Sequence, residues 1–193
     1  MNCKSCDDPM IPVHGQYHQR CKSCNTYEFP SDIEHGQVPI IPQGKTTEFQ
    51  CPKCDIPMEV GLIHNNIQIC FCNNCRGFVT PIESLGHLIN DLRSDYGGPD
   101  DRPVPIDPDE LEFVDNCPAC WEPMEAHPYY GPGNVVLDTC NQCQLCWLDH
   151  GELDKIVRAP GPRPNANPVG NLESQMLREK FSAQAAKREF KLW

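Results

Sequence analysis

Residues 117–143 read CPACWEPMEAHPYYGPGNVVLDTCNQC, with a Cys-x2-Cys pair at each end. Each such pair lets two thiolates reach one ion from a single tight turn, and the second pair completes a four-cysteine shell. The arrangement occurs three times in the chain, with gaps of 14, 17 and 19 residues between partner pairs, which is the range typical of zinc sites. The predicted metal ligands are Cys3, Cys6, Cys21, Cys24, Cys51, Cys54, Cys72, Cys75, Cys117, Cys120, Cys140 and Cys143.

The composition indicates that the chain needs such metal sites. Aromatic residues make up 8% of the 193 residues, and Pro and Gly are frequent at 20 and 13, so little apolar surface is available for one large core. We therefore predict a small metal-stabilised β-rich protein of three tandem zinc ribbons holding three Zn2+ ions, one per ribbon. A secreted disulfide framework is the alternative for fourteen cysteines.

The start of the chain favours metal over disulfides. It opens Met-Asn-Cys-Lys-Ser-Cys with no apolar signal segment, and no apolar run approaches the length that crosses a membrane. We therefore expect a cytoplasmic protein, in which thiols stay reduced and can bind metal.

The three repeats share further features. A Pro-Met dipeptide follows the first cysteine pair of each, and we expect its methionine (Met10, Met58 or Met124) to pack as a core residue beneath the cysteines. Asn65-Asn66 in the second repeat and residues 131–134 in the third are hairpin-turn signals. Each repeat is thus predicted to be a small antiparallel sheet whose stability depends on its metal.

Helix signals follow the second cysteine pair of each repeat. Thr80-Pro81-Ile82-Glu83 has the pattern of a capping box, and residues 149–152 and 31–34 are the corresponding signals in the third and first repeats. Apolar residues then recur at helical spacing, which predicts short helices after ribbons two and three. These residues are Leu85, Leu88, Ile89 and Leu92 in the second repeat and Leu153, Ile156 and Val157 in the third.

The predicted organisation alternates ribbons with linkers. Residues 94–116 are rich in Asp and Pro and are expected to form an extended, self-repelling linker. The terminal segment carries five Lys or Arg against three Glu, so it suits docking on a partner or an anionic surface, with a frayed terminal helix as the alternative. The divisions are 1–36 (ribbon 1, short and diverged), 37–50 (linker), 51–93 (ribbon 2 with a helix), 94–116 (acidic Pro-rich linker), 117–158 (ribbon 3 with a short helix), 159–171 (Pro/Asn linker) and 172–193 (C-terminal helix).

The third repeat resembles a known family. CPACWEPME followed by TCNQC and WLDHGEL is similar to the bacterial zinc-ribbon domain named after transcription factor IIB, whose pattern is CPxCxxxL and then CxxCGGxWLDxGEL. Repeat two looks like a diverged copy that keeps its cysteines and Gly77, and repeat one keeps little beyond the ligands. The resemblance implies zinc binding and a ribbon fold, and the family's name implies transcription.

Two cysteines, Cys70 and Cys146, lie outside the pairs. Cys146 directly follows Gln144-Leu145, the two positions at which the family pattern has Gly-Gly. They are interpreted first as small buried apolar residues, with alternative metal ligands or redox-sensitive thiols as competing hypotheses. A site of three cysteines and one histidine is a further alternative in any repeat, and rubredoxin-like iron is an alternative to zinc, because four sulfurs alone do not separate the two metals.

These patterns predict a non-catalytic protein. Four cysteines close the coordination shell of zinc, whereas catalytic zinc keeps one position open. We expect a protein-interaction adaptor or assembly subunit with a protein partner. Transcription-associated nucleic-acid binding is the first alternative, although a net charge of −11 opposes it. A thiol/zinc redox sensor is the second.

Overall fold

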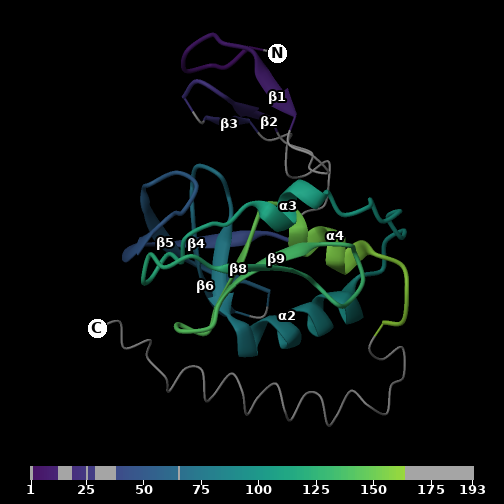
Figure 1. The fold of residues 1–193 in the computed structure, drawn as a ribbon. Coiled ribbons are helices and arrows are strands. Elements are labelled where there is room, and N and C mark those ends of the chain that lie inside the picture. The colour runs from purple at the N-terminus through teal and green to yellow at the C-terminus, as the bar shows by residue number, and fades with distance from the viewer. Residues whose placement is uncertain (1, 13–18, 25, 29–37, 65, 164–193) are drawn as a thin grey trace.

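The computed structural model describes residues 2–12, 19–24, 26–28, 38–64 and 66–163, and in these ranges the strands form two antiparallel sheets (Figure 1). The fold is β-rich with short helices, as predicted, and it carries three tetracysteine groups. The predicted C-terminal helix, the helix signal at 31–34 and part of the last linker lie outside the described residues. Among the residues described, no helix is both long and apolar enough to cross a bilayer.

Ribbon 1 forms the smaller sheet, which lies at the top of Figure 1. In its described part the buried core consists of Cys3, Met10 and Cys21. Two of these three residues are predicted metal ligands, so almost no apolar surface remains to hold the sheet without metal. Its strands are β1 (Met10–Pro12), β2 (Gln19–Cys21) and β3 (Tyr27–Glu28).

Ribbons 2 and 3 share the larger sheet, which has seven strands in the order β4-β5-β6-β7-β10-β9-β8. Strands β5 to β7 come from ribbon 2 and β8 to β10 from ribbon 3, so the ribbons join where β7 pairs antiparallel with β10. The pairing uses the two open edges that separate ribbons would expose to solvent. The strands are β4 (Ile40–Gln50), β5 (Pro57–Ile63), β6 (Ile67–Phe71), β7 (Phe78–Pro81), β8 (Glu125–Pro128), β9 (Val136–Cys140) and β10 (Leu145–Leu148).

An approximate two-fold axis passes through this seam. Val79 pairs with Trp147, and these residues are equivalent, because each follows the last cysteine of its ribbon at the same spacing. The neighbouring pairs, Thr80 with Cys146 and Phe78 with Leu148, then fall symmetrically about this position. The repeat in the sequence has therefore become an internal pseudo-dimer.

Trp147 fits at the seam because its neighbours are small. Its side chain is fully buried, and a Cβ added at Gly77 would lie 2.3 Å from its Cζ2 atom. Gly77 of ribbon 2 therefore makes room for the tryptophan of ribbon 3.

The segment 37–50, predicted to be a linker, instead provides β4 at one edge of the larger sheet. Ile40 pairs with Ile63, and the pairing continues to Gln50 with register shifts on the way. Gly44 has a φ of 66°, a value that glycine adopts without strain. The prediction was wrong because β5 offers unpaired backbone groups, which an adjacent segment of mixed polarity can satisfy.

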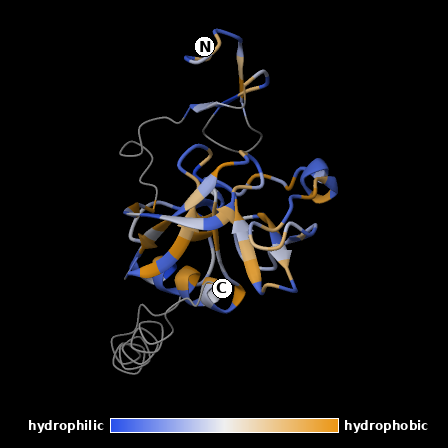
Figure 2. Cartoon of the chain, turned by 90° about the vertical axis from the view of Figure 1, so that its left-hand side faces the viewer, coloured by the Kyte–Doolittle hydropathy of each residue, from blue (hydrophilic) through white to orange (hydrophobic). Residues whose placement is uncertain are grey.

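The two longer helices lie on one face of the larger sheet. They are α2 (Ile82–Asp95) and α4 (Glu152–Arg158), and they confirm the helices predicted after ribbons two and three. The apolar stripes predicted for them are buried in one cluster with sheet residues such as Phe71, Phe78 and Leu148. Figure 2 shows the apolar residues concentrated on strands and helices, with hydrophilic residues in the connecting loops.

The predicted capping box at residues 80–83 is wrong. Pro81 is the N-cap of α2 and no side chain caps the helix, while the Thr80 hydroxyl has no hydrogen-bond partner. Thr80 belongs to β7 and pairs with Cys146 of β10, so the seam holds this residue in the strand. Tertiary pairing has overridden the local capping signal.

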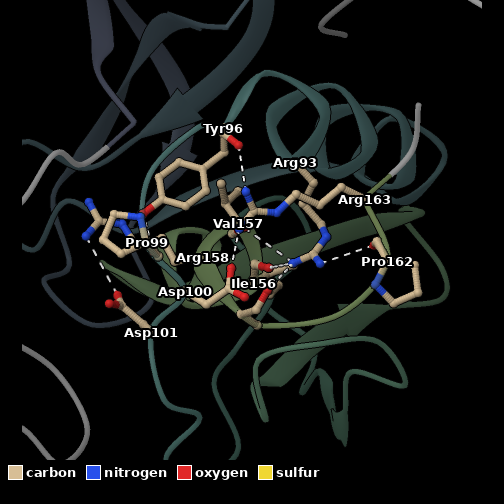
Figure 3. Close-up of polar contacts among 11 residues, drawn as sticks. Arg93, Tyr96, Pro99, Asp100, Asp101, Ile156, Val157, Arg158, Pro162 and Arg163 are labelled. Atoms are coloured by element: carbon tan, nitrogen blue, oxygen red, sulfur yellow. Dashed lines mark hydrogen bonds and ion pairs between the residues drawn. The ribbon is translucent and has the colours of Figure 1, made fainter. Parts of the chain in front are cut away.

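A buried arginine connects the two helices (Figure 3). Arg93 of α2 is 3% exposed, and its Nη1 donates to the carbonyl oxygens of Ile156 at 2.5 Å and Ala159 at 3.0 Å. Its Nη2 donates to Pro162 O at 3.3 Å. These acceptors include last-turn carbonyls that a helix cannot satisfy internally, so ribbon 2 caps the helix of ribbon 3.

The acidic segment 94–116 is more ordered than a self-repelling linker. Arg163 Nη1 donates to Tyr96 O at 2.7 Å, and the same guanidinium pairs with Asp100. Arg158 pairs with Asp101 at 3.7 Å. Arginines at the far end of ribbon 3 thus offset the repulsion that the acids alone would create (Figure 3).

A short helix, α3 (Pro108–Glu112), interrupts the same segment. Asp107 is its N-cap and accepts a hydrogen bond from Asp109 N at 3.1 Å, and Pro108 occupies the first turn. This Asp-Pro start is a recognisable helix signal that the charge pattern of the segment obscured.

The seam can be tested with two glycine substitutions. Gly77→Ala is expected to lower the free energy of unfolding by about 1–3 kcal/mol, because the new methyl group meets the buried Trp147 ring. Gly86→Ala in α2, where nothing lies within 4 Å of the added Cβ, is the matched control and should raise it by about 0.5–1 kcal/mol. Urea denaturation of the metal-loaded protein measures both, and equal effects of the two substitutions would contradict close packing at Gly77.

Candidate metal centres

The Cys-x2-Cys pairs form turns of one geometry. The residue after the second cysteine has a positive φ in five of the turns, at Asp7, Asp55, Arg76, Trp121 and Gln144. In four of these turns its backbone N–H donates to the carbonyl of the first cysteine, each at 2.9 Å. The left-handed residue reverses the chain so that both thiols of the pair point the same way.

These turns bring the cysteines together in three groups of four. In each group the sulfur atoms all lie within 4.8 Å of one another. Close Sγ–Sγ distances within the groups run from 3.4 Å for Cys6 and Cys24 to 3.7 Å for Cys120 and Cys140. Tetrahedral zinc with Zn–S bonds of about 2.3 Å requires sulfurs about 3.8 Å apart, so the donor sets fit zinc.

The three groups contain all twelve cysteines that the sequence singled out. Site 1 is Cys3, Cys6, Cys21 and Cys24; site 2 is Cys51, Cys54, Cys72 and Cys75; site 3 is Cys117, Cys120, Cys140 and Cys143. All fourteen cysteines are free thiols, which goes against the disulfide alternative, since a disulfide needs sulfurs about 2.05 Å apart. No histidine of the described residues joins a group.

Sites 2 and 3 share one buried cluster on the face of the sheet opposite the helices. Met58 and Met124 are 0% and 3% exposed and pack there beside the cysteines, as predicted for the Pro-Met dipeptides. Met10 is also buried and packs with the cysteines of site 1. Trp147 lies in the cluster shared by sites 2 and 3, so the seam and both metal centres stabilise each other.

Cys70 and Cys146 belong to none of the groups. Along β10 the side chains alternate, so Cys146 faces the helices while Cys70 in β6 faces the metal cluster. Both are buried. Burial raises the pKa of Cys70 to about 11, and it raises the pKa of Cys146 as well. A raised pKa keeps each thiol protonated and unreactive at neutral pH, which favours the interpretation as small apolar residues.

Four residues of the Trp-Leu-Asp-His-Gly-Glu-Leu stretch (147–153) have structural roles. Asp149 accepts a hydrogen bond from Trp147 Nε1 at 2.9 Å and so fixes the buried ring. Glu152 accepts one from Asp149 N at 2.7 Å, and Gly151 starts α4 with a φ of 88°. The motif therefore positions the tryptophan and begins the helix.

Lys53 links the two ribbons beside these residues. Its Nζ lies 2.6 Å from Asp149 Oδ2 and 3.1 Å from Asp115 Oδ2. Asp149 belongs to ribbon 3, and Asp115 lies two residues before its first cysteine. Burial alone lowers the pKa of Lys53, but Asp149 and Asp115 raise it well above its ordinary value, so the ammonium stays charged. Sequence reasoning missed this contact, because a lysine within a cysteine turn ordinarily points into solvent.

The third ribbon matches the transcription factor zinc-finger family. The matched residues are 116–159, which confirms the resemblance that the cysteines and the 147–153 stretch indicated. Comparison with curated proteins and with solved structures gave no significant match. The match favours zinc over iron at site 3, and the like geometry of sites 1 and 2 extends that preference to them.

Metal content is the direct test of the three sites. Natively purified protein is expected to carry three zinc ions per chain, and the pair Cys117→Ser with Cys120→Ser should reduce this to two, because site 3 loses half its ligands. Elemental mass spectrometry measures the content. The pair Cys70→Ala with Cys146→Ala is the control and should still bind three ions; iron in place of zinc would contradict the assignment.

The Lys53 link can be tested by a double-mutant cycle. Lys53→Met should lower the free energy of unfolding by about 3 kcal/mol. This value is at the low end for breaking a buried ion pair, because the Asp149 side chain is 31% exposed. Adding Asp115→Asn should recover part of the loss, since the amide removes one uncompensated buried charge. Lys45→Met, at an exposed position of β4, should change the value by less than about 0.5 kcal/mol. Strictly additive effects of the two substitutions would contradict the link.

Proposed function

We propose that this chain is a non-catalytic zinc protein that acts as an interaction adaptor or assembly subunit. The observation that carries the proposal is the closed four-sulfur donor set at all three sites, because a shell of four protein ligands leaves zinc no position for water or substrate. Twelve ligand thiols also require a reducing compartment, which supports a cytoplasmic location.

An exposed apolar surface directly before ribbon 3 supports the adaptor role. It consists of Leu111, Phe113 and Val114, which we call the α3 surface because they lie on α3 and directly after it. Their exposed fractions are 40%, 63% and 51%. Lys53 Nζ lies 5.8 Å from the centre of the Phe113 ring. The surface therefore adjoins the ion pair that joins the two ribbons.

The charge around this surface indicates which partner it suits. Asp109 and Glu112 are exposed on α3 itself, and Glu122 and Glu125 are exposed on the adjoining turn and β8. α3 packs beside β8, so the exposed carboxylates of both elements lie on the same side of the protein as the apolar residues. A partner segment with apolar side chains flanked by Lys or Arg would bury Phe113 and pair with the acids.

Nucleic-acid binding in transcription is the second candidate, because the matched family is described as a transcription factor zinc-finger. The net charge of −11 works against it, since binding to phosphate backbones relies on clustered positive charge. The α3 surface is acidic where such binding requires Lys and Arg, so protein binding remains the better supported proposal.

Peptide display on the zinc-loaded chain tests the adaptor role. Selected peptides should combine aromatic or aliphatic residues with Lys or Arg, and their affinity should fall as salt increases. The pair Phe113→Ser with Val114→Ser should weaken them by at least about tenfold, whereas Tyr130→Ser, at a residue 92% exposed within ribbon 3, should not.

The same protein can be offered generic DNA and RNA at low salt. Binding there together with no enrichment of basic-apolar peptides would overturn the adaptor proposal in favour of the nucleic-acid alternative. Peptides that bind the Phe113→Ser, Val114→Ser variant as tightly as the wild type would also overturn it.

A further inference from the structure

The three metal centres differ in how well their sulfurs are covered. In site 1 the residues Cys6 and Cys24 are exposed, whereas in sites 2 and 3 Cys54, Cys120 and Cys143 are half-buried and the other five cysteines are buried. Zinc leaves a thiolate site by attack of a competing ligand or an oxidant on metal or sulfur, and both need access. Site 1 is therefore the centre that solvent-borne reagents reach first.

The protein around the centres differs in the same direction. The described core of ribbon 1 is Cys3, Met10 and Cys21, so metal binding must itself order the whole small sheet, and that ordering subtracts from affinity. Sites 2 and 3 instead lie in a shared cluster that includes Met58, Met124 and Trp147. The seam and the helix-side core hold those ligands in place before metal binds.

We propose that site 1 is the exchangeable, oxidant-sensitive metal site of this chain, and that sites 2 and 3 form one structural unit that keeps its metal. The inference rests on the zinc binding proposed above. It also moves the redox-sensor hypothesis from Cys70 and Cys146, which are buried, to Cys6 and Cys24.

The chemistry at site 1 is a two-electron oxidation by a peroxide. The Sγ atoms of Cys6 and Cys24 lie 3.4 Å apart. Hydrogen peroxide and two protons convert their two thiolates to one disulfide and two water molecules: the sulfurs are oxidised and the O–O bond is broken. Only Cys3 and Cys21 would then remain as ligands at site 1. Two thiolates would bind Zn2+ far less tightly than four, so the ion would be released.

Tyr27 couples the presence or absence of metal at site 1 to the surroundings of site 2. It lies in β3, three residues after Cys24. Its partly buried ring packs against the cluster that contains the site 2 ligands Cys51, Cys72 and Cys75, and Cys54 packs against the same cluster. When site 1 loses metal, nothing in the described core of ribbon 1 keeps β3 ordered. Loss of metal at site 1 therefore uncovers the neighbourhood of site 2.

The test oxidises the full-length, zinc-loaded chain with graded hydrogen peroxide in the presence of a colorimetric zinc indicator. One zinc per chain should appear in a first phase at least about tenfold faster than the other two. Mass spectrometry after blocking free thiols should locate the first disulfide between Cys6 and Cys24. The pair Cys6→Ser with Cys24→Ser should abolish this phase and leave two zinc ions with unchanged slow release, whether or not ribbon 1 stays folded.

Two further variants separate the possible outcomes. Cys146→Ala should leave the fast phase unchanged. If the fast phase disappears in this variant, the redox-sensor hypothesis returns to Cys146. Tyr27→Ala should speed alkylation of Cys54 by N-ethylmaleimide severalfold. Release of all three ions in one phase, or first reaction at site 2 or 3, overturns the inference. A zinc count of zero before oxidation would instead overturn the zinc-binding proposal on which it rests.

Discussion

The antiparallel pairing of β7 with β10 is the interaction on which the larger part of this structure depends. A single ribbon has three short strands and an open edge, which is too little to bury a core. Joined at Val79 and Trp147, two ribbons form one sheet with a helix-covered face and a metal-bearing face. Arg93 and Lys53 reinforce the joint from either side, one across the helices and one beside the cysteine turns.

This seam also explains why, of the two joined ribbons, only ribbon 3 carries the tryptophan of the family pattern. Two equivalent tryptophans could not face each other on a two-fold axis without displacing the strands. Ribbon 3 supplies the large residue, while ribbon 2 supplies Gly77 and Val79 at the positions that receive it. Ribbon 2 has Val79 where the family pattern has tryptophan, and this difference is the complement of Trp147 in ribbon 3. Two unequal copies pack where two identical copies would clash.

Ribbon 1 has no such partner strand among the described residues, and its separateness gives the molecule two kinds of metal centre. Where a metal holds a module with almost no core, binding and folding are the same event. Where two centres share a core, either metal adds to an interior that packing already defines. The difference follows from the surroundings, because the donor sets are identical.

The sequence alone determined the ligands and the ribbon units. Cysteine spacing, the Pro-Met dipeptides and the stretch at 147–153 are local signals, because each acts within a short segment whatever surrounds it. The apolar stripes that predict helices after ribbons two and three are local in the same way. Only the tertiary structure decided that Ile40–Gln50 is a strand, that Thr80 leaves its capping role for the seam, and that arginines hold the acidic segment. The physical reason is that strand pairing and buried ion pairs join residues far apart in the chain. Neither the spacing nor the periodicity of one segment records which distant segment offers it hydrogen bonds or charge.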